Sequence, residues 1–364
     1  MIGTIIRELK PSAQNNRNSE GAFLKLKDGK LLFAYTRYGG EGAADHAKAD
    51  LYGLLSCDDG DTFGEPFELF TSDSLGADNI MSVSLMRMQN GDLGVFYLQK
   101  HNDRLSCIPW LARSSDEGKT WDSHVRCIAE DGYYVLNNDR VIALDNGRLI
   151  MPVSQHRRDG GKYMPGEVQI YASDDDGVTW KKLADGIQMA VPAGSRRENP
   201  GYLQNCMEPG VVQLKDGTLW CYIRTVLGRQ YESYSADNGE TWSVPVPSPF
   251  TAPDSPMCGK KLRNGKCFLV WNPIPVYNGK NRYPDGHFTG GRSPLVYTVL
   301  DEMGTYTPEL TVLEEDTDAG FCYCAIYETD NGDILLGYCA GNREDGGCLN
   351  KIRIRKIPKA DFAE

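Results

Sequence analysis

Residues 173–180 read Ser-Asp-Asp-Asp-Gly-Val-Thr-Trp, and a turn sequence of this kind occurs four times in the chain. The copies are SCDDGDTF (56–63), SSDEGKTW (114–121), SDDDGVTW (173–180) and SADNGETW (235–242), and DEMGTY (301–306) is a degraded fifth. The first four glycines lie 58, 59 and 62 residues apart. Ser and Asp can hydrogen-bond the turn backbone, Gly supplies a positive φ, and the aromatic ring anchors the turn on apolar surface. We interpret these turns as architectural.

A second repeated pattern alternates with the turns and consists of an apolar run, an Asp-Gly or Asn-Gly dipeptide and another apolar run. Its six copies have their glycines at positions 29, 91, 147, 217, 265 and 332. Such a pattern is typical of β-hairpins, because both dipeptides tolerate positive φ. Six units of about 60 residues, each near four strands long, predict an all-β fold, a six-bladed β-propeller of four-stranded antiparallel blades.

The two ends of the chain carry strand-like sequences, TIIREL (4–9) and KIRIRKI (351–357). We expect them to meet in one blade and close the ring. Since no Pro/Gly/Ser linker separates the repeats, we interpret residues 1–364 as a single propeller domain. The longest irregular stretches are 37–50, 155–167, 192–207 and 275–293, and we expect them to wall a pocket at one end of the axis.

Composition narrows the class of protein. Hydrophobic residues are 40% and charged residues 24%, and 39 Gly and 19 Tyr favour short strands and turns. No apolar run approaches the roughly 18 residues of a membrane span, so no membrane partner is expected. A net charge of -11 argues against nucleic-acid binding. The start, MIGTIIRELK, lacks a signal-like segment, so we expect a cytoplasmic protein, or a secreted one if a leader was removed.

No cofactor is implied by the sequence. The 11 cysteines fit buried thiols in a reduced compartment, and Cys322 and Cys324, which flank Tyr323, do not have a zinc spacing. The five histidines show no metal spacing, and no glycine-rich phosphate loop follows a strand and opens a helix. We therefore expect neither metal nor nucleotide, and the oligomeric state stays open.

Pseudo-symmetry selects candidate site residues. The position nine residues before each hairpin glycine should be equivalent in the innermost strand of every unit. The six residues at this position are Glu20, Ser82, Asn138, Glu208, Pro256 and Tyr323. Two carboxylates and a phenol around one cavity would form an acid/base set. The alternative is that these residues are solvated strand ends.

From about residue 15 onward the sequence resembles the sialidase (neuraminidase) superfamily, whose Asp boxes have the form of the four turns. The resemblance implies that Tyr323, nine residues before Gly332, is the nucleophile and that Glu208 is its base. It also implies that Asp45, in YTRYGGEGAADHAKADLYGLL, is the acid. A neutral phenol suits a substrate with a carboxylate on its anomeric carbon, which would repel a carboxylate nucleophile.

The resemblance also implies arginines that bind the substrate. Arg224 lies sixteen residues after Glu208 in EPGVVQLKDGTLWCYIR, and Arg292 opens a strand in GGRSPLVYTVL. Both would hold a substrate carboxylate through charge-assisted hydrogen bonds. Arg37, at the end of the strand before Asp45, matches a further family arginine.

One corner of the expected site departs from the family. The first family arginine falls on Ser19, and the glutamate that braces it falls near Cys339. Glu20 is then the charged group at this corner, where it would repel a substrate carboxylate. Arg17 lies two residues before Ser19 and could fill the gap, but we expect it not to do so.

Blade three supplies further candidates. Asp139 and Arg140 in NNDRVI, beside His156 and Arg157 in SQHRR, could contact substrate hydroxyls, or form a local salt bridge at a loop base.

Three functions remain open. The leading one is a retaining exo-glycosidase of the sialidase type, acting on a terminal sialic acid or related acidic sugar of a glycan or small sugar substrate. The second is an exo-glycosidase of the same fold for a different terminal sugar. The third is a non-catalytic propeller that binds glycan or protein.

Overall fold

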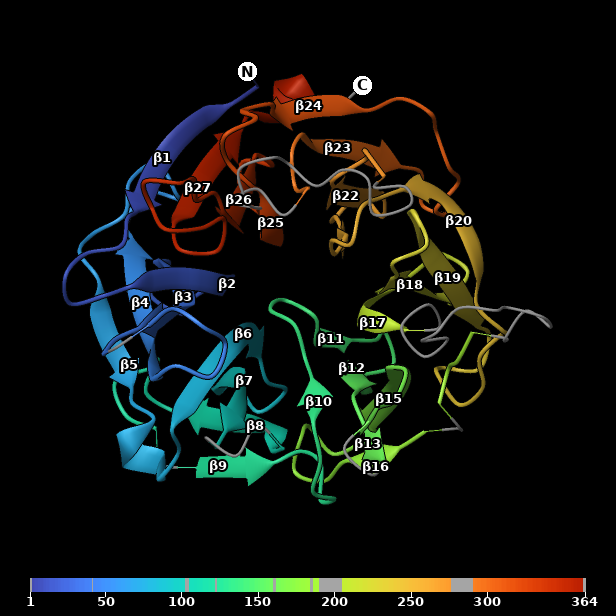
Figure 1. Cartoon of the computed structure of the whole chain (residues 1–364), viewed down its shortest axis with the longest axis horizontal. Coiled ribbons are helices and arrows are strands. Elements are labelled where there is room, and N and C mark those ends of the chain that lie inside the picture. The colour runs from blue at the N-terminus through green and yellow to red at the C-terminus, as the bar shows by residue number, and fades with distance from the viewer. Residues whose placement is uncertain are drawn as a thin grey trace.

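The computed structural model describes residues 2–40, 42–101, 105–121, 123–159, 162–183, 186–189, 205–275 and 291–362. Its strands form a ring around a central axis, with the two chain ends close together on the rim (Figure 1). The helices described are two short 3-10 turns, η1 (Asp73–Leu75) and η2 (Lys359–Asp361), and none is long and apolar enough to cross a membrane. The expectation of an all-β propeller is confirmed.

The largest sheet contains two antiparallel sets of strands joined by one parallel bridge between Ala49 and Asn79. The first set is β2 (Arg17–Lys25), β3 (Leu31–Tyr38), β4 (Ala49–Ser56) and β5 (Phe67–Phe70). The second set is β6 (Asn79–Arg87), β7 (Leu93–Lys100), β8 (Cys107–Ser114) and β9 (Ser123–Arg126).

The next strands along the chain form a five-stranded sheet and a separate hairpin. The sheet contains β10 (Tyr134–Val135), β11 (Ile142–Ala143), β12 (Leu149–Gln155), β15 (Glu167–Ser173) and β16 (Lys181–Lys182). The hairpin pairs β13 (Arg158–Asp159) with β14 (Lys162–Tyr163).

Three four-stranded sheets complete the ring. One is β17 (Met207–Gln213), β18 (Leu219–Arg224), β19 (Arg229–Ser235) and β20 (Val246–Thr251). Another is β21 (Cys258–Lys261), β22 (Cys267–Trp271), β23 (Leu295–Leu300) and β24 (Thr311–Glu314). In the last, β25 (Cys322–Glu328), β26 (Ile334–Cys339) and β27 (Ile352–Ile357) are followed by the N-terminal strand β1 (Thr4–Leu9), which pairs with β27.

The hairpin glycines have one backbone conformation. All six have φ between 86° and 88°, a region that side chains other than glycine rarely occupy, so the Asp-Gly and Asn-Gly dipeptides fix the positions of the turns. Apolar side chains of neighbouring sheets then share cores. One such core joins Phe268 of β22 to Ile326 of β25 and Leu336 of β26.

The four repeated turns bond internally as their sequence predicts. In the third, the Gly177 amide donates to the Ser173 hydroxyl at 2.7 Å, and the Thr179 amide donates to Asp175 Oδ1 at 2.8 Å. These turns also contact the neighbouring hairpin. The Gln89 amide donates to Asp176 Oδ1 at 2.9 Å, for example, so this turn caps the hairpin of the preceding strands, β6 and β7.

The inner strands are irregular where they begin, nearest the axis (Figure 1). The register shifts between Ser19 and Ala22 in β2, and at equivalent points in β6, β17 and β25. Each irregularity holds one non-glycine residue with positive φ, namely Glu20 (57°), Ser82 (60°), Glu208 (45°) and Tyr323 (55°). These are β-bulges, which re-aim a side chain at the cost of local strain.

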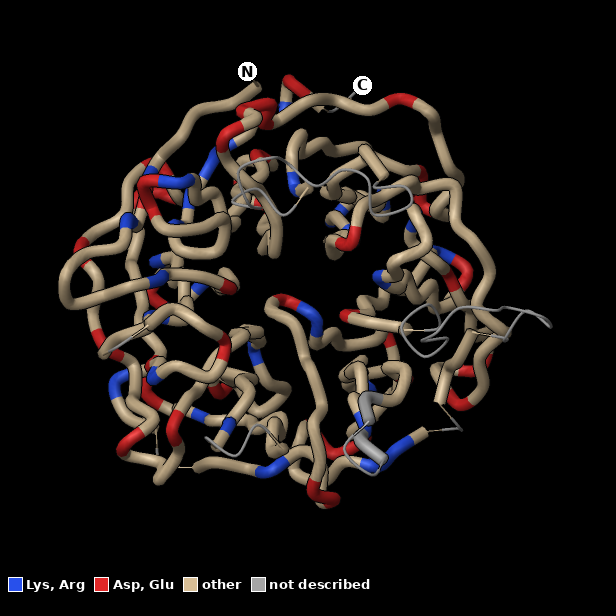
Figure 2. The backbone as a smooth tube through the Cα atoms, viewed as in Figure 1, with Lys and Arg blue, Asp and Glu red and all other residues tan. Residues whose placement is uncertain are grey.

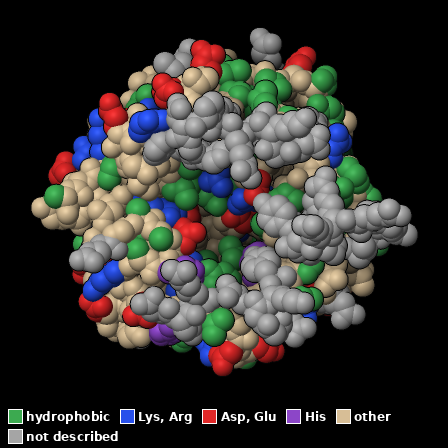
Figure 3. All heavy atoms as spheres, in the orientation of Figure 1, with side chains coloured by type: hydrophobic (Ala, Val, Ile, Leu, Met, Phe, Trp, Pro, Cys, Tyr) green, Lys and Arg blue, Asp and Glu red, His purple; other side chains and the backbone are tan. Residues whose placement is uncertain are grey.

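Two loops expected to wall the pocket fall mostly outside the described residues, because 190–204 and 276–290 are not described. Among the described residues, acidic and basic positions lie at the inner ends of strands around the axis (Figure 2). The same face is hollowed at its centre, with charged side chains along the hollow (Figure 3).

Candidate active site

The bulges of β17 and β25 bring a phenol and a carboxylate together. The Tyr323 hydroxyl donates to Glu208 Oε1 at 2.8 Å, within the range expected from the sequence. Arg224, at the end of β18, donates from Nη1 to Glu208 Oε2 at 2.6 Å and to the Tyr323 hydroxyl at 3.4 Å. The Glu208 and Arg224 side chains are each 11% exposed, so this trio is shielded from solvent.

The environment gives Tyr323 and Glu208 distinct protonation states. Burial, reinforced by the charge of Glu208, raises the pKa of Tyr323 well above its usual value, although Arg292 and Arg224 oppose the shift. Burial would raise the pKa of Glu208, but the attraction and hydrogen bond of Arg224 outweigh it and the pKa is lowered. The pair therefore rests as a neutral phenol bonded to a carboxylate, which is the arrangement of a nucleophile and its base.

Sequence reasoning missed the residue that orients Arg224. Asp254 accepts a hydrogen bond from Arg224 Nε at 2.8 Å through Oδ1, and its backbone carbonyl accepts from Nη2 at 3.1 Å. Asp254 lies in the segment between β20 and β21, where no repeated motif marks it, so only the fold reveals the contact.

Arg292 also lies beside Tyr323. Its guanidinium is 5.2 Å from the centre of the Tyr323 ring, and Nη1 donates to the Cys322 thiol at 3.0 Å. Among the described residues Arg292 forms no salt bridge with a carboxylate, and its Nε is buried without a hydrogen-bond partner. A cation in this state favours binding of an anion.

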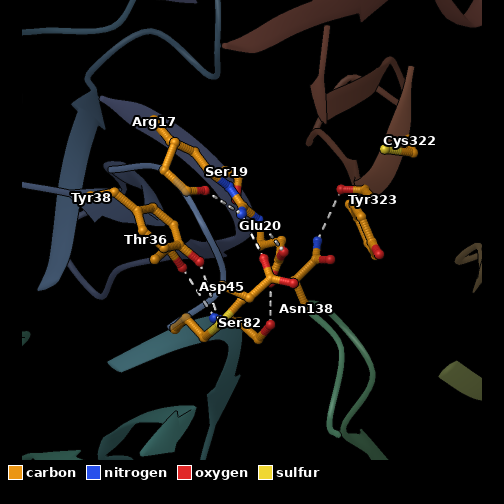
Figure 4. Close-up of polar contacts among 12 residues, drawn as sticks. Arg17, Ser19, Glu20, Thr36, Tyr38, Asp45, Ser82, Asn138, Cys322 and Tyr323 are labelled. Carbon is orange, nitrogen blue, oxygen red and sulfur yellow. Dashed lines mark hydrogen bonds and ion pairs between the residues drawn. The ribbon is translucent and has the colours of Figure 1, made fainter. Parts of the chain in front are cut away.

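The expectation for the corner near Ser19 is wrong, because Arg17 fills it. Its side chain is buried, with Nε donating to the Ser19 hydroxyl at 3.0 Å and Nη1 donating to Asp45 Oδ1 at 2.6 Å (Figure 4). Nη2 donates to Glu20 Oε1 at 3.0 Å, so the charge of Glu20 is paired and does not face the cavity alone. Arg17 lies two residues before Ser19 on β2, so its side chain reaches this corner from a position that the motif count does not select.

Asp45 is the most exposed of the candidate groups, with 56% of its side chain accessible. Partial desolvation of the carboxyl group would raise the pKa of Asp45, but the charges of Arg17 and Lys100 outweigh this effect and lower the pKa. Asn138 links this corner to the nucleophile, because its amide nitrogen donates to the carbonyls of Gly21 at 2.9 Å and Tyr323 at 3.1 Å (Figure 4).

Three other candidates do not join these groups. The guanidinium of Arg37 lies over the Tyr52 ring at 4.5 Å. The hydroxyl of the preceding residue, Thr36, accepts a hydrogen bond from the Ser82 amide. Because successive side chains in a strand point to opposite faces, Arg37 points away from Ser82. Asp139 accepts from Lys260 Nζ at 2.7 Å and from the Ile326 amide at 3.0 Å.

Arg140 is buried and donates to the Tyr222 hydroxyl at 2.9 Å and the Met257 carbonyl at 2.6 Å. Arg140 and Asp139 line a cavity of about 470 Å³ farther along the inner strands, which Tyr323, Glu208 and Asp45 do not line. Their side chains connect neighbouring sheets, and Asp139 forms a salt bridge with Lys260 of β21.

His156 lies near the nucleophile pair, and burial lowers its pKa to about 4 against the opposing charge of Glu208. Arg157 pairs instead with Glu167. Within the part of the chain that is described, no group of three or more His, Cys, Asp or Glu side chains is arranged to hold a metal ion.

Comparison with known proteins identifies a family that matches most of this chain. The family described as a BNR repeat-like domain matches residues 77–336. A curated sialidase from Paraclostridium sordellii is 29% identical, over 39% of this chain and 39% of that protein, so the match spans well under half of the relative's length.

Solved structures extend the comparison over the whole fold. A protein of unknown function from Dyadobacter fermentans has a TM-score of 0.72 at 17% identity, covering 98% of this chain and 99% of that one. A sialidase from Streptococcus pneumoniae has a TM-score of 0.71 at 15% identity, covering 100% of this chain and 71% of that one. At these identities the likeness shows a shared propeller fold.

Proposed function

We propose that this chain, which belongs to the BNR repeat-like domain family, is a retaining exo-glycosidase of the sialidase type that acts on a terminal sialic acid or related acidic sugar. The observation that carries the proposal is the 2.8 Å hydrogen bond between Tyr323 and Glu208, with Arg224 on the same carboxylate at 2.6 Å. The sialidases among the similar proteins support the reaction class.

The proposed reaction has two steps. In the first, the Tyr323 oxygen attacks the anomeric carbon as its proton passes to Glu208, and the glycosidic bond breaks as Asp45 gives a proton to the leaving oxygen. In the second, Asp45 takes a proton from water, which attacks the same carbon. The bond to Tyr323 then breaks and Glu208 returns its proton to the phenol. Two displacements at one carbon retain its configuration.

Arg292 supports an acidic substrate. Its guanidinium faces the ring of Tyr323, and among the described residues it pairs with no carboxylate. A substrate carboxylate on the carbon that Tyr323 attacks would therefore meet an uncompensated cation. Arg224, which donates to the Tyr323 hydroxyl, would contribute its charge as well, although Glu208 and Asp254 already share it.

One observation favours a second candidate, an exo-glycosidase of the same fold for a different terminal sugar. The nitrogens of Arg17 already donate to Ser19, Asp45 and Glu20, so this arginine has little left to offer a substrate carboxylate. A hydroxyl or amine would suit this corner better. A propeller that only binds glycan or protein is the remaining alternative and predicts no turnover.

A panel of fluorogenic terminal glycosides tests the proposal, with Tyr323→Phe as the control. Turnover of a sialoside with retention of configuration, together with a 2,3-difluorosialic acid adduct on Tyr323, supports the sialidase type. Turnover of only a neutral glycoside supports the second candidate. No turnover on any member, with glycan binding retained, supports the binding propeller.

We also propose six blades in a single domain. The support is that one parallel bridge joins the two halves of the largest sheet, each of which has four antiparallel strands. Counting these halves separately, with the sheets that contain β12, β17, β21 and β25, gives six units that match the six sequence repeats.

A further inference from the structure

Arg17 is shared by two carboxylates in the corner that departs from the family pattern. Nη1 donates to Asp45 at 2.6 Å and Nη2 donates to Glu20 at 3.0 Å (Figure 4). The side chains of Arg17 and Glu20 are only 2% and 5% exposed, whereas that of Asp45 is 56% exposed. One buried guanidinium therefore holds a buried acid on one side and an exposed acid on the other.

The other groups that face this cluster come from three further elements. Lys100 of β7 donates from Nζ to the Asp45 carbonyl at 3.1 Å, and Ser82 of β6 donates to Glu20 Oε2. The ring of Tyr38 in β3 lies against the Arg17 guanidinium at 4.5 Å. With His46 beside Asp45 in the chain, the charged set among the described residues is two cations, two carboxylates and one histidine.

The two carboxylates compete for Arg17. Each negative charge disfavours ionisation of the other, and each withdraws part of the attraction that Arg17 offers. Burial raises the pKa of Glu20, while Arg17 and Ser82 oppose the shift and the charge of Asp45 adds to it. In Asp45 the shift has the opposite sign. The positive charges of Arg17 and Lys100 lower its pKa despite burial, so this acid gives up its proton readily.

We propose that Glu20 is a positioning residue for proton transfer, which shares Arg17 with Asp45 and thereby keeps Asp45 able to carry the proton for the leaving group. The inference rests on the proposed function only in assigning Asp45 as the acid. It predicts that the charge of Glu20, rather than its size, sustains activity. In Glu20→Gln the side chain fills nearly the same space, but its neutral amide no longer competes with Asp45 for the positive charge of Arg17.

Kinetics of Glu20→Gln provide the first test. Without the competing charge, the pKa of Asp45 should fall further, so its protonated fraction at neutral pH falls as well. We expect kcat/KM to fall about tenfold for a substrate with an alkyl or sugar leaving group, which needs the proton. An aryl glycoside with a strongly acidic leaving group should change little. Equal losses on both substrates, or no loss on either, would overturn the proposal.

Carboxyl 13C NMR titration provides the second test and needs no turnover. The Asp45 signal, assigned with Asp45→Asn, should titrate at lower pH in Glu20→Gln than in the unaltered protein. An unchanged titration would overturn the proposal even if the enzyme is active. Conversely, if no glycoside is hydrolysed, the proposed function fails while the titration still decides the role of Glu20.

A matched control separates the effect from loss of any buried acid. Glu314 of β24 is likewise buried and accepts from Arg353 at 2.6 Å and Arg355 at 2.7 Å, outside the candidate site. Glu314→Gln should leave the Asp45 titration unchanged. If Glu20→Gln does not fold, Ser82→Ala replaces it: loss of this hydroxyl should raise the pKa of Glu20 and lower that of Asp45, and two unchanged titrations would reject the proposal.

Discussion

At the scale of single residues, the charge states of Tyr323 and Glu208 decide what the candidate site can do. The phenol keeps its proton because ionisation would place a second negative charge beside Glu208 in a buried site. Glu208 keeps its charge because Arg224 compensates for burial. Proton transfer from Tyr323 to Glu208 is therefore favourable only as the phenol oxygen bonds to a substrate carbon.

Replacing either member of this pair should disable turnover. We expect Tyr323→Phe and Glu208→Gln each to lower kcat by roughly 10²–10⁴-fold, the range for loss of a group that moves a proton in the transition state. Tyr97→Phe, which alters a buried tyrosine bonded to His124, serves as the control. Activity within threefold of the unaltered protein in Tyr323→Phe would exclude this tyrosine as nucleophile.

The pH dependence follows from the same pair. Since the pKa of Glu208 is lowered from its ordinary 4.5, its charged form persists below that pH. Activity that needs ionised Glu208 should be present above pH 4.5 and be lost as pH falls through the lowered pKa. A pH profile of kcat/KM checks this, and an acid limb centred well above 4.5 would contradict the assignment of Glu208 as base.

Arg292 should discriminate between acidic and neutral sugars. A charge-assisted contact is worth about 1.5–3 kcal/mol, so Arg292→Ala should lower kcat/KM for an acidic sugar tenfold to more than a hundredfold, mostly through KM. A neutral analogue of the same sugar should lose much less. Equal losses on the two substrates would show that Arg292 supports the fold and does not bind the carboxylate.

Arg17 should matter for stability as well as for activity. Removal of one partner from a buried ion pair leaves the other uncompensated, so Arg17→Ala should lower the free energy of unfolding by about 3–5 kcal/mol. The double variant Arg17→Ala/Glu20→Gln should recover part of this loss, because no buried charge remains. Urea unfolding measures both, and Arg7→Ala, which removes an exposed pair with Glu65, should have little effect.

At the scale of elements, the repeated turns and the β-bulges have different structural roles. The repeated turns bond internally through Ser and Asp and cap neighbouring hairpins, so they fix the sheets relative to one another. The bulges in β2, β6, β17 and β25 instead rotate one side chain of each strand out of the regular alternation. The turns thus stabilise the ring, and the bulges place the reactive groups.

A turn aspartate should stabilise the protein in a pH-dependent way. Hydrogen bonds from the Thr179 hydroxyl and amide lower the pKa of Asp175 to about 2. Asp175→Ala should cost roughly 1–2 kcal/mol at pH 7. Since the folded-state pKa lies below the unfolded one, the contribution is present above about pH 4 and is lost as pH falls toward 2.

Unfolding measured from pH 7 to pH 3 checks this prediction. The difference between Asp175→Ala and the unaltered protein should narrow as pH falls. Asp131→Ala, which removes a 95% exposed side chain paired with Arg126, should change stability by less than about 0.5 kcal/mol. A constant difference at every pH would show that the charge of Asp175 is not the stabilising feature.

At the scale of the whole molecule, the pairing of β1 with β27 joins the two ends of the chain. Arg353 of β27 donates to Glu8 at 2.8 Å, and Arg355 donates to the Ile2 carbonyl at 2.6 Å. Without β1, β27 would present an unpaired edge, and exposed edges promote aggregation. The first strand is therefore a structural part of the ring and not an appendage.

Deletion of residues 2–9 should accordingly lower Tm by at least about 5 °C and promote association of the folded protein. Thermal unfolding with light scattering measures both effects. A deletion variant that stays monomeric with an unchanged Tm would show that the remaining sheets hold the ring without this strand.

The sequence alone determined those features that depend on local chemistry. Six Asp-Gly or Asn-Gly dipeptides set the hairpins, because their φ of 86–88° suits glycine, and four Ser-x-Asp turns follow from side chains that bond their own backbone. Counting from a hairpin glycine also located Glu208 and Tyr323. Between these residues and their glycines the chain is one strand with one bulge, so the count stayed in register.

Tertiary structure decided which side chains meet. Arg17 of β2 reaches Asp45 in the segment between β3 and β4, whereas Arg37 points to the opposite face of its strand and packs on Tyr52. Asp139 and Arg140, expected near substrate, contact groups on other sheets more than 80 residues away. A local pattern fixes the backbone turn, but the direction of a side chain and its distant partners depend on how the sheets pack around the axis, and this no local pattern encodes.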